Sequence, residues 1–148
     1  MIDKNYVLLP SGLNDLSQLR TIEKVCFPLD AWPLLELITV LILPGLVRIK
    51  AEADGKMVGF VGGDAHIGQG VGWITTLGVL PEYRRFGIAS ALLDECEKKM
   101  SMPVVKLSVR KSNLGAQRLY FQQGYEQIEV WNKYYEGGED ALVLAKRL

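Results

Sequence analysis

The stretch from Val79 to Ala89 holds the residues whose types and spacing favour chemistry most clearly. A strand-like pattern ends at Pro81, two arginines follow at positions 84 and 85, and a helical pattern begins at Gly87. A helix N-terminus exposes unpaired N–H groups, glycine lets an anion approach the backbone, and arginine adds charge-assisted hydrogen bonds. The pattern predicts a cradle for a pyrophosphate, with a solvated surface turn as the alternative.

Two common phosphate-binding motifs do not describe this stretch. A dinucleotide site needs Gly-x-Gly-x-x-Gly between a strand and a helix, and a Walker loop needs Gly-Lys-Ser/Thr. The six residues from Arg84 to Ala89 instead read Arg-Arg-Phe-Gly-Ile-Ala. This order resembles the Arg/Gln-x-x-Gly-x-Gly/Ala signature of the acyl-coenzyme A site in GNAT N-acetyltransferases.

Other segments extend the resemblance over nearly the whole chain. The run Leu107–Asn113, followed by Leu119–Tyr120 and Gly124–Tyr125, looks like the cofactor-binding C-terminal half of that family. The segments Ile22–Trp32 and Asn132–Tyr135 are similar to the RimI-like branch, whose members acetylate protein N-termini. The chain therefore resembles a GNAT N-acetyltransferase of the RimI-like branch.

The resemblance implies cofactor-binding residues on a strand, a loop and two helices. Backbone groups of Leu77 and Val79 would pair with a pantetheine arm, and one N–H would polarise the thioester carbonyl as an oxyanion donor. Asn113 would contact the cofactor, a role compatible with capping the helix that follows. The implied set is Leu77, Val79, Arg84, Arg85, Phe86, Gly87, Ile88, Ala89, Ser90 and Asn113. The implied cofactor is acetyl-CoA, used as a co-substrate, and no metal is expected.

Tyr120 matches the general acid of the family, which protonates the departing thiolate. A phenol with a pKa of about 10 is protonated at neutral pH and can donate to a thiolate whose conjugate acid has a pKa of about 8.5. Packing of an aromatic side chain on an amphipathic helix is the alternative interpretation.

The general base is not evident. The family pattern often has Glu or His where this chain has Ser108, and serine alone is a weak base. The single histidine, His66, lies in a predicted turn, so a relayed water is favoured over it. This gap favours an acceptor of low pKa, because at pH 7 about one α-amine in ten is neutral, against fewer than about one lysine amine in a thousand.

The acceptor site is expected between two loops. Tyr134 and Tyr135 would line a peptide groove, with cross-strand aromatic packing as the alternative. Phe27 would form the facing wall together with Leu29 and Trp32, for which burial in the core is the simpler interpretation.

We therefore expect an acetyl-CoA-dependent N-acetyltransferase that acts on a primary amine, foremost the α-amine of a protein or peptide N-terminus. Direct attack through a tetrahedral intermediate is implied. Two alternatives stay open: a small-molecule amine as acceptor (a polyamine, amino acid or antibiotic), or a CoA-binding regulatory module without catalysis. A closed acidic pocket would favour the small amine. Glu139 and Asp140 are candidates for contact with a cationic substrate, with a solvated turn as the simpler interpretation.

Length and composition bound these hypotheses. A chain of 148 residues predicts a single domain over residues 1–148. With 49% hydrophobic residues, the chain is expected to be globular rather than disordered. The 17 Lys and Arg residues balance 17 Asp and Glu residues, which argues against nucleic acid or an anionic membrane as partner. A homodimer is left open.

The cysteines and the termini favour the cytoplasm. Cys26 and Cys96 both fall on the apolar side of helical patterns, so we expect two buried thiols in a reducing compartment. The first residues do not resemble a signal peptide. The apolar run Leu34–Leu43 is shorter than the roughly 20 residues that a membrane helix needs.

The elements that must position these residues follow from periodicity and turn signals. Strands are predicted over 6–9, 46–53, 57–65, 71–80, 104–109, 125–134 and 141–146, and helices over 13–27, 33–43, 87–100 and 113–123. The second helix is apolar on more than one face, which indicates burial on two sides or a groove or partner surface. The order predicts an α+β, GNAT-type fold with a central mixed, mostly antiparallel sheet of about seven strands and four helices.

Overall fold

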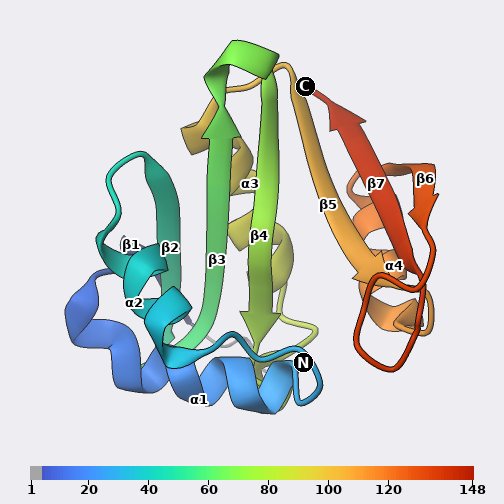
Figure 1. Cartoon of the computed structure of the whole chain (residues 1–148). Helices are drawn as coiled ribbons and strands as arrows, with labels where there is room; N and C mark the ends of the chain where they lie inside the picture. The colour runs from blue at the N-terminus through green and yellow to red at the C-terminus, as the bar shows by residue number, and fades with distance from the viewer. Residues whose placement is uncertain (1–4) are drawn as a thin grey trace.

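The computed structural model describes residues 5–148, which form a mixed sheet of seven strands (Figure 1). The strand order is β1-β2-β3-β4-β5-β7-β6, and within residues 5–148 only the neighbours β4 and β5 run parallel. The strands are β1 (Val7–Pro10), β2 (Leu46–Ala53), β3 (Lys56–His66), β4 (Val71–Val79), β5 (Val104–Arg110), β6 (Glu126–Trp131) and β7 (Ala141–Arg147).

Helices cover both faces of the sheet. α1 (Leu16–Cys26) and α2 (Leu34–Ile42) lie on one face, and α3 (Ile88–Met100) and α4 (Leu114–Gln122) lie on the other (Figure 1). Short 3₁₀ turns are η1 (Leu13–Asp15), η2 (Ile67–Gln69) and η3 (Pro81–Tyr83). The predicted α+β fold with a mixed, mostly antiparallel sheet and four helices is confirmed.

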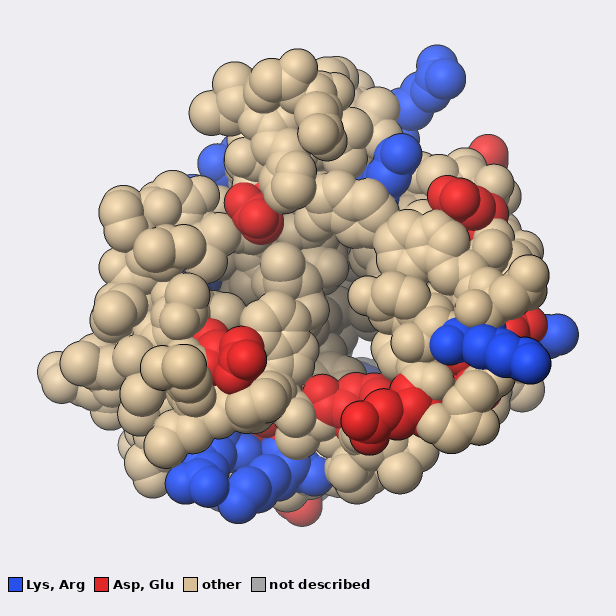
Figure 2. Space-filling model, in the orientation of Figure 1, with Lys and Arg blue, Asp and Glu red and all other residues tan. Residues whose placement is uncertain are grey.

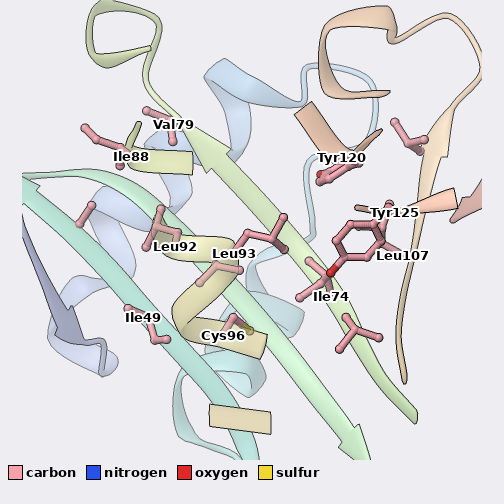
Figure 3. Close-up of a cluster of buried hydrophobic side chains, with 14 of the residues drawn as sticks. Ile49, Ile74, Val79, Ile88, Leu92, Leu93, Cys96, Leu107, Tyr120 and Tyr125 are labelled. Carbon is pink, nitrogen blue, oxygen red and sulfur yellow. The ribbon is translucent and has the colours of Figure 1, made fainter. Parts of the chain in front are cut away.

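The apolar spacing read from the sequence forms one core on each face. On the face of α1 and α2, Leu19, Ile22 and Leu37 are buried against the sheet. On the opposite face, Leu92 and Cys96 of α3 pack at the centre of a larger cluster (Figure 3). Cys96 is fully buried as predicted, and burial raises the pKa of its thiol to about 12. The periodicity of α1 and α3 therefore predicted which sides face the sheet.

On the first face, one prediction is wrong and one of the two alternatives for α2 is excluded. Cys26 is only half-buried, because it lies at the last turn of α1 beside the end of β4. α2 is not buried on two sides: it buries Leu37 and Val40, while Leu35 and Ile42 are 72% and 53% exposed. The second apolar face of α2 is therefore open to solvent.

The last hairpin is shorter than predicted. β6 ends at Trp131, three residues earlier than the pattern indicated. Lys133 adopts a left-handed conformation with φ of +52°, and its N–H donates to Asp140. The backbone therefore leaves the strand there, and Tyr134 and Tyr135 lie in the loop between β6 and β7.

The pairing of β3 with β4 shifts register between Gly62 and Gly63, which leaves Thr75 as an extra residue on β4. Such a bulge reverses the faces that successive side chains reach. Ile74 packs in the core on the α3 side, whereas Thr76 donates to a carboxylate on α1. The glycine pair therefore marks a bulge, one of the two roles that the sequence indicated.

The second indicated role, close approach of the backbone, is also present at Gly63. A Cβ atom there would lie 2.6 Å from the Cys96 sulfur and 2.8 Å from that of Met100. Glycine therefore allows α3 to pack directly on the middle of the sheet.

The sheet opens between its two parallel strands. β4 pairs with β5 only where Val71–Trp73 lies beside Val104–Lys106. Beyond Trp73 the two strands diverge (Figure 1), and β4 continues to Val79 without a partner on that side. Unpaired backbone groups at such an edge can bind an extended ligand.

Candidate functional site

The backbone of Leu77 and Val79 faces the opening. The N–H of Leu80 donates to the carbonyl of Val58 on β3, at 2.8 Å. Because backbone groups of successive strand residues point in opposite directions, those of Val79 and Leu77 point away from β3. Both positions predicted to meet a pantetheine arm therefore border the opening.

The loop after β4 presents a helix end. Arg85 and Gly87 adopt left-handed conformations with φ of +68° and +80°. The N–H of Ala91 bonds back to the carbonyl of Gly87, and no side chain within residues 5–148 caps this end of α3. The N–H groups of Ile88 and Ala89 are therefore among those left without an intrahelical partner.

The space above Gly87 fits an anion. A Cβ atom built on Gly87 would meet no atom within 4 Å, whereas Phe86 and Ile88 pack into the core and anchor the loop. Arg85 is exposed beside this space. Left-handed turns joined to a helix start form a concave, positively polarised site. These residues fit the pyrophosphate of acetyl-CoA.

Arg84 is placed differently from the expectation. Its Nε donates to the Val79 carbonyl at 2.9 Å, and one Nη lies 3.7 Å from the sulfur of Cys26. The guanidinium therefore links the end of β4 to the end of α1. The carbonyl of Val79 is already used, which leaves its N–H for a ligand.

Two further predicted residues lie at the ends of helices. The side chain of Asn113 accepts the N–H of Ala116 at 3.2 Å, so its capping role is present. The hydroxyl of Ser90 accepts from Gln123 at 3.2 Å, which ties α3 to the end of α4. Ser90 therefore lies where the start of α3 meets the end of α4, and Asn113 lies at the opposite end of α4.

Tyr120 is buried on α4 with its hydroxyl unengaged. The side chain is 8% exposed, its ring contacts Tyr125 edge-on at 5.9 Å, and its hydroxyl makes no hydrogen bond within residues 5–148. In Figure 3, β4 runs between Leu92 and Tyr120, which belong to the same core cluster. Burial, with a smaller effect of Tyr135, raises the pKa of the Tyr120 phenol. The phenol therefore holds its proton across the neutral range.

Ser108 and Tyr135 form a hydroxyl pair on the β5 side of the opening. Their oxygens lie 3.2 Å apart, and Tyr135 is half-buried in the loop between β6 and β7. Burial raises the pKa of Tyr135. Neither group is a strong base, so the gap expected from the sequence remains.

Other candidates for the base lie elsewhere or are occupied. His66 is at the η2 end of β3, opposite to the open end of β4, and pairs with Asp64 at 3.1 Å. Glu23, a residue that the sequence analysis did not single out, is 1% exposed, and burial raises its pKa. Its carboxylate accepts the Thr76 hydroxyl at 2.7 Å and the Trp32 N–H at 3.3 Å. Glu23 belongs to the segment Ile22–Trp32 that carried the family resemblance but received no role there, and its polar side chain interrupts the apolar repeat of α1.

The proposed facing wall is mixed. Phe27 and Trp32 are half-buried in the segment between α1 and α2, and Trp32 packs against the core there, while Leu29 is 70% exposed. Tyr134 is 56% exposed and packs on Trp131 with ring centroids 5.0 Å apart. Core burial is thus incorrect for Leu29, and aromatic packing accounts for part of the Tyr134 environment.

The acidic candidates are engaged within the chain. Glu139 accepts from Arg110 at 2.8 Å and from the N–H of Ser112 at 2.8 Å. Asp140 accepts the N–H of Lys133 at 2.9 Å. Arg110 was part of a quoted motif but received no role, because its partners lie far away in the sequence.

The surface is hollowed at the opening of the sheet, between a β4 wall that ends at Gly87 and a β5 wall that carries Ser108 and Tyr135. Figure 2 shows this hollow between the halves of the molecule, with uncharged side chains around most of it and Asp and Glu gathered on its lower rim. Residues 5–148 contain no group of three His, Cys, Asp or Glu residues arranged to hold a metal. No helix in this part of the chain is long and apolar enough to cross a membrane.

Several curated proteins are similar to this chain. An uncharacterized N-acetyltransferase of Methanocaldococcus jannaschii is 39% identical over 101 residues, and N-alpha-acetyltransferase 20 of Dictyostelium discoideum is 37% identical over 112 residues. These matches cover 66% and 71% of this chain, but only 64% of the length of either relative. An N-alpha-acetyltransferase of Sulfurisphaera tokodaii is 31% identical over 159 residues, covering 98% of this chain and 95% of that protein.

Solved structures share the fold. The ribosomal-protein-S18-alanine N-acetyltransferase of Escherichia coli has a TM-score of 0.86 at 22% identity, over 97% of this chain and 94% of that one. Arabidopsis thaliana NAA60 in complex with a bisubstrate analogue has a TM-score of 0.84 at 25% identity, over 97% and 98% of the two chains. NAA60 has also been solved in complex with acetyl-CoA.

The family model described as acetyltransferase (GNAT) matches residues 16–125. This range contains the Arg84–Ala89 motif, the open end of β4 and the helix that carries Tyr120. The family resemblance read from the sequence is confirmed: the chain belongs to the acetyltransferase (GNAT) family.

Proposed function

We propose that this chain transfers an acetyl group from acetyl-CoA to the α-amine of a protein or peptide N-terminus. The observation that carries the proposal is the opening between β4 and β5, which has a helix N-terminus at its end and a buried phenol beside it. Relatives named N-alpha-acetyltransferase, one of them matched over 98% of this chain, support the acceptor class.

The residues divide the chemistry between the two walls. Acetyl-CoA supplies a thioester, and transfer forms a C–N bond to the acceptor while the C–S bond breaks. An N–H of Leu77 or Val79 would donate to the carbonyl oxygen, where negative charge develops. Tyr120 would give its proton to the departing sulfur. The hydroxyls of Ser108 and Tyr135 would pass the proton lost by the amine to water.

Engagement of the acidic side chains favours a peptide over a small cationic acceptor. Both oxygens of Glu139 accept hydrogen bonds within the chain, and Asp140 caps a neighbouring backbone N–H. No acidic pocket is thus left to hold a polyamine at these residues.

The proposal also includes the organisation and location of the protein. It comprises one acetyltransferase domain over residues 1–148, a cytoplasmic location suited to the free thiols of Cys26 and Cys96, and no nucleic acid or membrane partner.

An acceptor panel tests the proposal. Purified protein is mixed with acetyl-CoA and with a peptide whose only amine is its N-terminus, an N-blocked peptide with one lysine, or spermidine. We expect the first peptide to react about 100-fold faster than the second, because no strong base deprotonates a lysine amine. The rate with the first peptide should rise up to about pH 8, as its α-amine loses its proton. Release of free thiol and the mass of the product measure transfer.

The other outcomes separate the alternatives. Transfer to spermidine but to neither peptide would identify a small-amine enzyme. Binding of acetyl-CoA by calorimetry without transfer to any amine would identify a CoA-binding module.

A further inference from the structure

Arg110 joins two loops that are distant in the sequence. At the end of β5, its Nε and one Nη donate to the two oxygens of Asp30, each at 2.6 Å. Its other Nη donates to Glu139 at 2.8 Å. Asp30 lies between α1 and α2, and Glu139 lies between β6 and β7. The guanidinium side chain is only 13% exposed, so the bridge is largely sheltered from water.

These loops carry the residues proposed to meet the acceptor. Phe27 lies on the first loop, and Tyr134 and Tyr135 lie on the second. The guanidinium also sits 4.6 Å from the centroid of the Tyr135 ring, whose hydroxyl pairs with Ser108 on the same strand. A single side chain thus fixes both loops and the orientation of Tyr135.

The bridge lies where the sheet itself provides no connection. Backbone pairing between β4 and β5 stops at Trp73 and Lys106, four residues before Arg110. On the opposite face, Glu97 connects α3 to the C-terminal strands through Tyr125 and Lys146. On the acceptor face, Arg110 and Asp30 form the polar link across the opening within residues 5–148. The spacing of the two loops therefore depends on this link.

We propose that Arg110 is a positioning residue that sets the separation of the two acceptor-binding loops. This inference rests on the proposed function. Both oxygens of Asp30 and of Glu139 are used to hold the loops, so these acids shape the groove and do not bind the acceptor ammonium. The bidentate geometry needs a guanidinium, because lysine offers a point charge and cannot form the fork.

The kinetic test compares Arg110→Gln and Arg110→Lys with the unaltered chain. We expect the KM for an acceptor peptide to rise about tenfold in Arg110→Gln and by less in Arg110→Lys, while the KM for acetyl-CoA changes less than twofold. Asp30→Asn should raise the peptide KM in the same direction, and the double variant Asp30→Asn/Arg110→Gln should be no worse than Arg110→Gln alone. Lys98→Gln, which removes the exposed pair between Lys98 and Asp94 on α3, is the matched control and should change neither KM.

Hydrogen exchange gives a readout that does not need turnover. Arg110→Gln should exchange faster over residues 27–33 and 132–140, with exchange in α3 unchanged. Unaltered exchange in both loops, or equal changes in the KM values for peptide and acetyl-CoA, would overturn the inference. If the unaltered chain acetylates no amine, the proposed function fails, and the exchange experiment still decides whether Arg110 holds the loops together.

Discussion

The two walls of the opening are built by different means. The β4 wall offers mainly backbone: the edge of a strand, a bulge, a left-handed glycine and the first turn of α3. The β5 wall offers side chains from three separate segments: Ser108 from β5, Tyr120 from α4 and Tyr135 from the loop between β6 and β7. A backbone site depends on local conformation, whereas a side-chain site depends on how distant segments are held together. This difference predicts where substitutions harm cofactor binding and where they harm acceptor binding.

The largest expected effect is on the backbone wall. Gly87→Leu would place a side chain in the open space above the loop and force a left-handed conformation on leucine. We expect affinity for acetyl-CoA in calorimetry to fall by about 1,000-fold, because several charge-assisted hydrogen bonds to phosphate are lost together.

Gly45→Leu is the control for that variant. Gly45 has a φ of +88° and similarly open surroundings, but it lies between α2 and β2. It should suffer the same backbone strain and keep its affinity for acetyl-CoA. Unchanged affinity in Gly87→Leu would remove the pyrophosphate site from this wall.

Tyr120→Phe tests the side-chain wall. Removing the hydroxyl should lower kcat for peptide acetylation about 100- to 1,000-fold, because the departing thiolate loses its proton donor. Affinity for acetyl-CoA should stay within about twofold, since the ring and its packing are kept. Tyr6→Phe on the distant edge of the sheet serves as control, and a kcat equal to that of the unaltered chain in Tyr120→Phe would contradict the assignment of the acid.

A smaller effect is expected at Glu97, which links α3 to Tyr125 and to β7 on the α3 face of the sheet. Glu97 is 3% exposed and accepts from Tyr125 at 2.7 Å and from Lys146 at 3.0 Å. Glu97→Gln removes the charge that Lys146 faces and should lower the free energy of unfolding in urea by about 1–3 kcal/mol. Glu95→Gln on the same helix should change it by less than about 0.5 kcal/mol. Equal stabilities for the two variants would show that this tie contributes little.

The smallest effect concerns acid. Hydrogen bonding by the Ser112 side chain, followed by that of Arg110, lowers the pKa of Glu139. Since its pKa is lower in the folded chain than in the unfolded one, its contribution to stability is complete above the ordinary glutamate value and is lost as the pH falls through the lowered value. As the pH falls below the ordinary glutamate pKa of about 4.3, the loop over residues 132–140 should therefore gain hydrogen exchange, after correction for the intrinsic rate. Glu139→Gln should show no such additional gain, and a gain equal to that of the unaltered chain would point to another acid.

The same contrast explains how much the sequence could predict. The strands, the helices and the loop around Gly87 follow from local periodicity and turn residues, and the glycine pair at 62 and 63 correctly indicated both a bulge and close packing. The bridge from Arg110 to Asp30 could not be predicted in this way, because 80 residues separate its ends. Glu23 was hidden for the same reason: its partner Thr76 lies 53 residues away. The bond from Arg84 to the nearby carbonyl of Val79 was likewise not predicted, and its contact with the cofactor stays a prediction.

The extra residue in β4 sets the phase of the strand relative to its two helical layers. If Thr75 were instead paired as a regular strand residue, Leu77 and Val79 would turn their side chains toward α1, and Thr76 would turn its hydroxyl into the apolar layer under α3. Loss of the bulge with Thr75 retained would therefore invert both contacts at once, whereas deletion of Thr75 would keep Ile74 and Thr76 on opposite faces. The unpaired residue itself, rather than the chemistry of its side chain, therefore decides which layer each later residue of β4 reaches.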